Sequence, residues 1–326
     1  MKSVSNPTLS RLVSQLPSVI KAGKSDNTLK KYDIYFRKFK LWCLDYGLDY
    51  LPASITTVAL YLTFLIQSNV STSVLNATFY SLKWEHELNL FDNMFNDNFL
   101  KLILEGGIRT LAKPVNKKCP ITPEILRNIV LKYGDSNDVK DLRLCCLMLL
   151  GFSGFLRYDE LSHIQTKHIS IYETHAEILL EKSKTDTHRQ GNVVVIARTK
   201  TDLCPVSMLE KYLNVTNIDL HSDQFIFRSV TFFKSKNISA LCKQNKPLSY
   251  TRAREIVLEA LTQLGYDKKQ FGLHSLRSGG VTAAASNSVP DRLLKSHGRW
   301  KSDKSKDGYI QESFSNKLFV SSNLGI

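Results

Sequence analysis

The stretch that most restricts the fold is VKDLRLCCLMLLGFSGF, residues 139–155, which is apolar all round. A helix without a polar face has to be enclosed by other elements. The sequence therefore predicts a central buried helix with a domain built around it. Cys145 and Cys146 lie in this run and are expected to behave as small buried hydrophobic side chains.

The segments that follow predict a mostly helical chain with a small amount of β structure. Residues 122–134 begin with a threonine cap followed by proline and glutamate, which is the pattern of a helix start. Residues 176–181 and 192–197 are expected to be two strands of a β-hairpin with a basic, polar turn. From about residue 205 onward we expect mostly helix with loops. The predicted fold class is α+β, mostly α with a small β-hairpin or sheet.

A separate helical domain is predicted ahead of residue 112. Apolar side chains recur at spacings of three and four from Leu29 to Tyr46 and define a helix that Gly47 ends. Three more helices are expected at about 55–68, 72–90 and 97–110. Residues 111–122 contain two prolines and three lysines and read as an interdomain linker. The predicted organisation is an N-terminal arm (1–24), a helical domain (25–112), a linker (113–120) and a second domain (121–326) with a C-terminal tail (311–326).

The excess of positive charge indicates a polyanionic partner. The chain carries 44 lysines and arginines against 30 aspartates and glutamates, and its pI is near 9.4. Nucleic acid is the first interpretation of this balance, and an anionic membrane surface is the second. Opposite the apolar stripe of the helix that begins near Thr28 lies a basic face, either a DNA-binding surface or an ordinary solvated one. Its members are Lys30, Lys31, Arg37, Lys38 and Lys40.

Several classes of protein find no support in the motifs. The six cysteines show neither a CxxC pair nor a disulfide-like framework, which predicts a reducing compartment. There is no signal-peptide pattern and no run near the roughly 20 apolar residues of a transmembrane helix. No second histidine follows His86 at the spacing of a metalloprotease zinc site, and there is no Gly-rich phosphate-binding loop. We therefore expect an intracellular protein with no membrane span, no metal site and no nucleotide cofactor.

Side chains in the second domain suit one reaction, the cleavage of a phosphodiester. Two guanidinium groups can neutralise the non-bridging oxygens of the pentacoordinate transition state. A tyrosine hydroxyl can attack the phosphorus where nearby cations or a base help it to ionise. A lysine in a desolvated site can donate a proton to the leaving 5′ oxygen. The side chains available for these roles are Arg157, Arg277, His274, Lys184 and Tyr309.

The spacing between Trp300 and Tyr309 predicts a break in the chain between them. The two are nine residues apart, so one continuous helix would place them on opposite sides. The intervening Lys-Ser-Asp offers a new helix cap. We expect the tyrosine to lie on a following helix.

In this order, the motifs RYDEL, KSKT, HSLRSGG and GRWKSDKSKDGYI resemble those of the tyrosine recombinase family, of the phage-integrase type. The resemblance covers roughly residues 25–315 and extends to the layout, a helical core-binding (SAM-like) DNA-binding domain followed by a catalytic domain. It implies a site-specific DNA recombinase or integrase that cuts and rejoins strands through a covalent 3′-phosphotyrosyl intermediate. Because that link preserves the phosphodiester energy, such an enzyme needs neither metal nor ATP. The motifs look closest to those of eukaryotic mobile elements, of the crypton or retrotransposon sort, or of viral relatives.

The resemblance also implies roles for individual residues. Arg157 and Arg277 would clamp the transition state, and Glu160 would brace the first of them. Tyr309 would form the covalent link, and His274 would assist the proton transfer at that tyrosine.

Other roles follow from the same resemblance. Lys184 would be the general acid, with Lys182 as the alternative, and Trp300 would pack and hydrogen-bond at the scissile phosphate. His297 is extra to the matched set and would face DNA or support the fold. The expected DNA contacts, besides the basic face of residues 30–40, are Lys182, His188, Arg189, His297 and Arg299.

Partners and alternatives complete the prediction. The resemblance implies double-stranded DNA bound by a homo-oligomer, a tetramer in which the tail 311–326 docks on a neighbouring subunit. The expected location is the nucleus in a eukaryote, and otherwise the cytoplasm or nucleoid.

Two other functions share these features: a type IB topoisomerase-like nicking and closing enzyme, and a domesticated DNA-binding protein that no longer cleaves. Relaxation of supercoils without a specific site would favour the first, and failure to cleave a verified site would favour the second.

Overall fold

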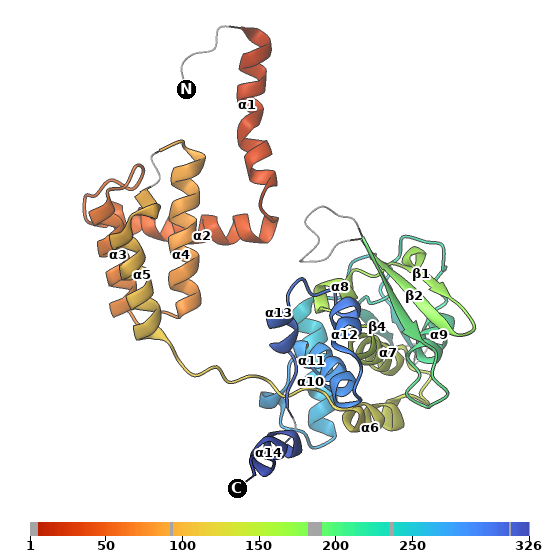
Figure 1. Cartoon of the computed structure of the whole chain (residues 1–326). Helices are drawn as coiled ribbons and strands as arrows, with labels where there is room; N and C mark the ends of the chain where they lie inside the picture. The colour runs from red at the N-terminus through yellow and green to blue at the C-terminus, as the bar shows by residue number, and fades with distance from the viewer. Residues whose placement is uncertain (1–5, 92–93, 182–190, 235–237, 313, 326) are drawn as a thin grey trace. The chain divides into compact units, whose positions relative to one another are not determined.

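The computed structural model describes residues 6–91, 94–181, 191–234, 238–312 and 314–325 (Figure 1). The chain divides into two compact units, Met1–Asn116 and Lys117–Ile326. This division falls within the segment whose prolines and lysines indicated a linker. Each unit has its own hydrophobic core and is described separately.

The first unit is helical throughout the residues that the structure describes. Serine caps begin three of the helices, because Ser25, Ser54 and Ser71 each accept a hydrogen bond from the backbone N–H three residues later. The core lies between the second and later helices, whereas no residue of the first helix is buried. The elements are α1 (Pro7–Ala22), α2 (Asp26–Asp45), α3 (Ile55–Gln67), α4 (Thr72–Leu88), η1 (Met94–Asn96) and α5 (Asn98–Leu111).

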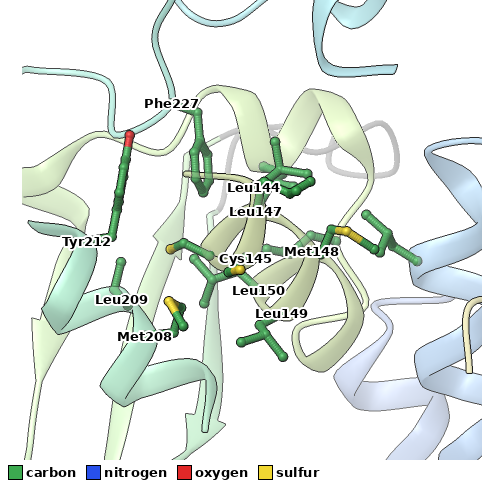
Figure 2. Close-up of a cluster of buried hydrophobic side chains, with 14 of the residues drawn as sticks. Leu144, Cys145, Leu147, Met148, Leu149, Leu150, Met208, Leu209, Tyr212 and Phe227 are labelled. Carbon is green, nitrogen blue, oxygen red and sulfur yellow. The ribbon is translucent and has the colours of Figure 1, made fainter. Parts of the chain in front are cut away.

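The second unit is assembled around α7 (Val139–Ser153), as the apolar run of the sequence predicted. Eleven of the fifteen residues of this helix are buried. Figure 2 shows part of this core, with Leu209 and Tyr212 of α9 (Pro205–Thr216) on one side of α7 and Met148 of α7 on the side away from them. The remaining helices of this unit are α6 (Pro123–Tyr133), α8 (Tyr158–Ser162), η2 (Thr166–His168), α10 (Tyr250–Gln263), η3 (Lys268–Gln270), α11 (His274–Ser286), α12 (Asp291–His297), α13 (Asp303–Asp307) and α14 (Phe314–Ser322).

The predicted β-hairpin is present and belongs to a three-stranded antiparallel sheet. Its strands are β2 (His175–Leu180) and β3 (Asn192–Ala197), which pair with Ile178 opposite Val194. The third strand, β1 (Ile169–Ile171), pairs with β2 and was not predicted because three residues are too few to show an alternating pattern.

A second hairpin corrects the expectation of helix and loops after residue 205. It consists of β4 (Val230–Phe233) and β5 (Ile238–Leu241), paired antiparallel with Val230 opposite Leu241. The sequence KSKN (234–237) between them lacks the glycine of a tight hairpin turn, so the pattern does not predict a hairpin. Ser239 of this hairpin donates to the side chain of Asp138, the cap of α7, at 3.0 Å.

Two glycines allow α11 to lie directly against neighbouring backbone. A Cβ atom on Gly279 would lie 2.0 Å from the carbonyl oxygen of Ile121, and one on Gly280 would lie 2.1 Å from that of Phe152. No side chain fits at either position without moving the backbone. The Ser-Gly-Gly that follows Arg277 therefore places the start of α11 close to the end of α7.

Among the described residues, none of the helices combines the length and the apolar character that crossing a membrane requires.

His86 of α4 ties the connection between α2 and α3 to the core of the first unit. The ring is 1% exposed, its Nδ1 lies 2.8 Å from the carbonyl of Leu82, and its Nε2 accepts from the N–H of Ala53 at 2.9 Å. Because Nε2 can accept only in the neutral ring, Nδ1 carries the proton. Burial lowers the pKa of His86, and the bond to Leu82 opposes part of that shift.

We therefore expect acid to destabilise the first unit through His86. The unfolded histidine titrates near 6.5 and the folded one at a lower pH, so the unfolded state binds the proton first. The contribution of His86 to the free energy of unfolding is full above about pH 6.5 and declines as the pH falls below it. Denaturant unfolding of the full chain, followed by tryptophan fluorescence between about pH 7.5 and pH 5, measures the decline.

The matched variant is His86→Gln, which cannot titrate. It should be less stable at neutral pH by about 1–2 kcal/mol, because the two buried hydrogen bonds are imperfectly replaced. Its stability should depend less on pH than that of the wild type. The same decline in both proteins would show that another group is responsible.

Candidate active site

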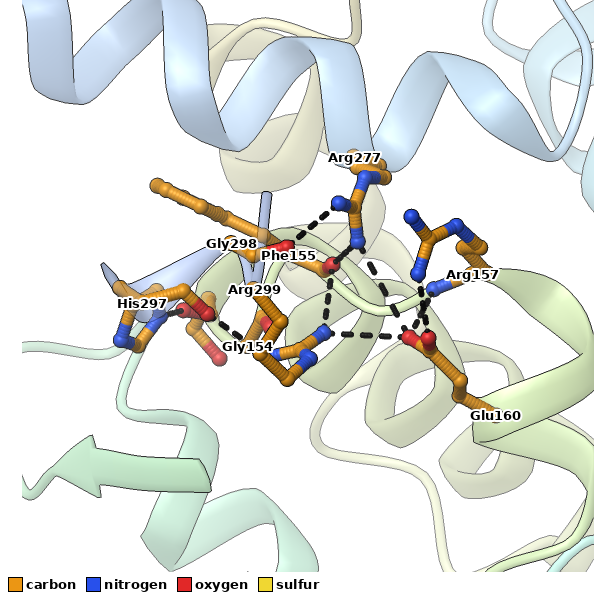
Figure 3. A network of polar contacts seen from close by, with 9 residues as sticks. Gly154, Phe155, Arg157, Glu160, Arg277, His297, Gly298 and Arg299 are labelled. Atoms are coloured by element: carbon orange, nitrogen blue, oxygen red, sulfur yellow. Dashed lines mark hydrogen bonds and ion pairs between the residues drawn. The ribbon is translucent and has the colours of Figure 1, made fainter. Parts of the chain in front are cut away.

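A single buried carboxylate lies among three arginines in the second unit (Figure 3). Glu160 of α8 accepts from the guanidinium of Arg157 at 2.6 Å and from the backbone N–H of the same residue at 2.9 Å. The guanidinium bond is to Oε1, while Oε2, which takes the backbone N–H, is also 3.1 Å from Nη2 of Arg299 and 3.9 Å from Nη1 of Arg277. The side chains of Glu160 and Arg277 are 2% and 0% exposed. These four residues together carry a net positive charge in a buried place.

The arginines keep Glu160 ionised. Burial alone would raise the pKa of Glu160, but the charge of Arg299 and the charge and hydrogen bonds of Arg157 outweigh it, so the pKa is lowered. Burial lowers the pKa of Arg277, and repulsion from Arg157 and Arg299 adds to the effect. A guanidinium nevertheless stays charged at neutral pH, because its ordinary pKa lies so far above that range.

The carbonyl of Phe155 is a second anchor for two of the arginines. It accepts from Nη1 of Arg277 and, at 3.0 Å, from Nη2 of Arg299. Phe155 has φ of +45°, a left-handed conformation that costs a residue other than glycine about 1–2 kcal/mol. Arg277 also donates from Nη2 to the carbonyl of Gly298 at 2.6 Å. The turn that ends α7 is therefore shaped to point a carbonyl at the arginines.

Arg277 also lies against the two aromatic residues that the sequence singled out. The central carbon of its guanidinium is 4.4 Å from the ring centre of Trp300 and 5.1 Å from that of Tyr309. The two rings are 5.5 Å apart and tilted by 47°. The structure thus brings together Arg157, Glu160, Arg277, Trp300 and Tyr309 from α8, α11 and the segment after α12.

Tyr309 lies in the turn that follows α13, and the expectation that it would lie on a helix is wrong. Ser302 caps α13 as the sequence suggested, but the helix ends at Asp307, two residues before the tyrosine. The carbonyl of Tyr309 instead accepts from Ser278 Oγ at 2.6 Å and from Thr282 Oγ1 at 3.4 Å. Sequence reasoning missed Ser278 and Thr282. The serine directly after Arg277, on the same helix, was the available signal.

Three buried donors of this cluster have no hydrogen-bond partner among the described residues. They are Nε1 of Trp300, Nε of Arg277 and Nε of Arg299. A buried N–H without a partner is costly, and a bound ligand is one way to supply the missing acceptor. An anion bound beside Arg277 would also balance the excess positive charge.

Arg299 is predicted to contact DNA, and His297 is predicted to face DNA or to support the fold. The Arg299 side chain is 6% exposed and donates to the carbonyls of His297 and Phe155 as well as to Glu160, so it braces the site from beneath. His297 is half-buried and its Nε2 lies 2.8 Å from the carbonyl of Ser153. Burial lowers the pKa of His297, the bond to Ser153 opposes this, and Arg299 and Arg277 add to the lowering. The structure gives both residues a supporting position.

The remaining predicted residues are spread more widely. His274 is exposed at the first position of α11. Lys182, Lys184, His188 and Arg189 lie outside the described residues. On α2, four members of the basic face are exposed, and Lys40 is half-buried over the ring of Tyr50 at 4.6 Å. No described group of three or more His, Cys, Asp or Glu side chains is arranged to hold a metal ion.

A model of the phage integrase family matches residues 124–316, which is more than half of the chain. The chain belongs to the phage integrase family. It is therefore a tyrosine recombinase, as the motifs predicted. The "integrase/recombinase xerD homolog" of Selenomonas ruminantium is 28% identical to it over 297 residues, which cover 90% of this chain and 84% of the relative.

Two solved structures share the fold of this tyrosine recombinase at 13% sequence identity. The XerH site-specific recombinase, bound to its palindromic difH substrate after cleavage, matches with a TM-score of 0.57 over 92% of this chain and 78% of its own. The Tn1549 transposon integrase, in complex with transposon right end DNA, matches with a TM-score of 0.58 over 93% and 95%. The predicted fold class is confirmed.

Glu160→Gln should strongly destabilise the second unit. The change leaves three arginines without a counter-charge in a buried place, and breaking such a pair costs about 3–5 kcal/mol. Denaturant unfolding of the full chain measures the loss. The control is Glu105→Gln on α5, since Glu105 pairs with Arg109 at 2.5 Å where both side chains are largely exposed. Equal effects of the two changes would show that burial adds nothing to the Glu160 interaction.

Proposed function

We propose that this recombinase binds double-stranded DNA at a specific site and cleaves it through Tyr309. The observation that carries the proposal is the contact of Arg277 with both Trp300 and Tyr309, in which Arg277 and Trp300 each have an unpartnered buried N–H. A phosphate placed there would lie beside the phenol, between Arg157 and Arg277. Because all these residues come from one chain, the attack would take place within a single subunit.

The proposed reaction is an in-line displacement at phosphorus. The phenol oxygen of Tyr309 forms a bond to phosphorus and the bond to the 5′ oxygen breaks, which leaves a 3′-phosphotyrosyl link. Arg157, Arg277 and the indole N–H of Trp300 stabilise the charge on the non-bridging oxygens. Lys184, with Lys182 as the alternative, gives the proton to the leaving oxygen, and His274 assists removal of the phenol proton. Attack by the 5′ hydroxyl of another strand reverses these steps and rejoins the DNA.

The covalent step tests this function directly. The wild-type chain should form an adduct with a nicked suicide duplex that carries its site, and Tyr309→Phe should form none, since the attacking oxygen is gone. Tyr172→Phe, which removes a hydroxyl from an exposed tyrosine of the same unit, is the matched control and should react at the wild-type rate. Denaturing electrophoresis detects the adduct. Adduct formation by Tyr309→Phe would assign the nucleophile to another residue.

The same assays separate the alternatives. Relaxation of supercoiled DNA that lacks the site would favour a topoisomerase-like enzyme, and no adduct on a verified site would favour a protein that binds without cutting.

We propose that the first unit is the core-binding domain and that its basic face on α2 contacts phosphates. Steep weakening of binding with salt would support this role. The expected sites of action remain the nucleus in a eukaryote and otherwise the cytoplasm or nucleoid, and origin in a mobile element or virus stays a prediction.

The C-terminal tail supports the proposal of a tetramer on DNA. Four apolar side chains of residues 318–324 are about half to two-thirds exposed, with none of them buried by the rest of the chain: Leu318 (47%), Phe319 (68%), Val320 (66%) and Leu324 (63%). Exposed apolar side chains gathered on one short segment are typical of an interaction surface. We propose that this tail docks on a neighbouring subunit.

Deleting residues 312–326 should then abolish cooperative pairing of two DNA sites while single-site cleavage continues. Gel-shift assays with one and two sites, together with the adduct assay, report the two properties separately. Phe319→Glu is a milder change with the same expected direction. Unchanged pairing of sites by both variants would contradict the docking of the tail.

A further inference from the structure

The first residues of the second unit contact the chain on both sides of Tyr309. Lys117 donates from Nζ to the carbonyl of Gly308 at 3.3 Å, one residue before the tyrosine. Gln311, two residues after it, donates from Nε2 to the carbonyl of Lys118 at 2.9 Å. Residues 117–121, which we call the leading segment, thus flank the nucleophile although they are far from it in the sequence.

The leading segment is fixed at its other end to α11 and its approach. The N–H of Cys119 donates to the carbonyl of Gln270 at 2.7 Å, and that of Ile121 donates to the carbonyl of Ser275 at 2.9 Å. The side chain of Ile121 is 1% exposed in the core, and its carbonyl lies where a Cβ on Gly279 would be. The segment therefore runs from the buried helix that carries Arg277 to the turn that carries Tyr309.

The contacts along this path differ in exposure. Ser278, whose hydroxyl holds the carbonyl of Tyr309, is 9% exposed. Lys117 and Lys118 are exposed and Gln311 is half-buried. Exposed hydrogen bonds contribute little free energy and open easily. The carbonyl of Tyr309 and the backbone N–H of Gln311 are thus held by α11, while the contacts of Gly308 and of the Gln311 side chain with the leading segment would break on a small displacement of that segment.

We propose that Lys117 and Gln311 are positioning residues for Tyr309, through which the chain arriving from the first unit regulates the alignment of the nucleophile. Lys117 directly follows Asn116, the last residue of the first unit, so a pull from that unit reaches this residue first. When both contacts are made, the turn is fixed on each side of the phenol. When they open, the turn keeps only its bonds to α11 and to the end of α13, and a smaller fraction of molecules has the phenol aligned. The proposal rests on the function proposed above, because it assumes that Tyr309 attacks DNA.

Gln311→Glu tests the contact with the least change in shape. The amide donor is lost and a carboxylate faces the carbonyl of Lys118. In single-turnover cleavage of the suicide duplex by the full chain, the rate at saturating protein should fall about threefold to tenfold, as expected for one lost hydrogen bond. The protein concentration that gives half the maximal rate should stay unchanged. Gln311→Lys, which restores a donor of similar length, should recover most of the rate.

The lysine is tested with a matched pair of exposed residues. Lys117→Ala should slow the same covalent step, whereas Lys113→Ala, four residues earlier in the linker, should not. A wild-type rate for Gln311→Glu, a loss that Gln311→Lys does not recover, or equal effects of Lys113→Ala and Lys117→Ala would overturn the inference and leave the proposed function intact. Absence of an adduct with the wild-type chain would overturn the proposed function itself.

Discussion

The carboxylate of Glu160 is the interaction on which the rest of the site depends. Arg157, Arg277 and Arg299 repel one another, and burial removes the water that would screen that repulsion. Glu160 and the carbonyl of Phe155 hold them together nonetheless, at distances of 2.6–3.9 Å from the carboxylate. One carboxylate cannot neutralise three guanidiniums, and the remaining positive charge is what favours a phosphate in the same place. Stability of the folded unit and affinity for an anion therefore have a common electrostatic origin.

The position of these charges follows from the way α7 is buried. Because the helix is enclosed on all sides, its end is fixed, and the turn at Gly154 and Phe155 is held in one conformation against α11. Gly279 and Gly280 let α11 approach to backbone contact, which brings Arg277 under the carbonyl of Phe155. The left-handed conformation of Phe155 is tolerated since the packing on both sides leaves the turn no alternative. The apolar run that constrains the fold is thus also what positions the chemistry.

Sequence reasoning found the elements that rest on local patterns and missed those that rest on tertiary contacts. The buried helix, the hairpin of β2 and β3, and the matched residues Arg157, Glu160, Arg277, Trp300 and Tyr309 were visible as periodicity or ordered motifs. The position of Arg299 was not, because an arginine beside a glycine in a basic segment looks solvated until its partner, Glu160, is known. The sequence predicts a helix at Tyr309 in place of the turn, since the cap at Ser302 is visible in the sequence but the hydrogen bonds from Ser278 and Thr282 are not.

Some contacts of Tyr309 come from a rigid helix and others from an exposed segment. The first set fixes the position of the tyrosine, and the second allows its alignment to be regulated. Arg277, Ser278 and Thr282 lie on one helix, so the proposed transition-state clamp and the carbonyl of the proposed nucleophile keep a fixed separation. A helix of thirteen residues packed against α7 does not deform with small forces. Regulation would then act on the contacts that the helix does not make, those of the Gly308 carbonyl before the tyrosine and of the Gln311 side chain after it. Both of these contacts are with exposed lysines of the leading segment.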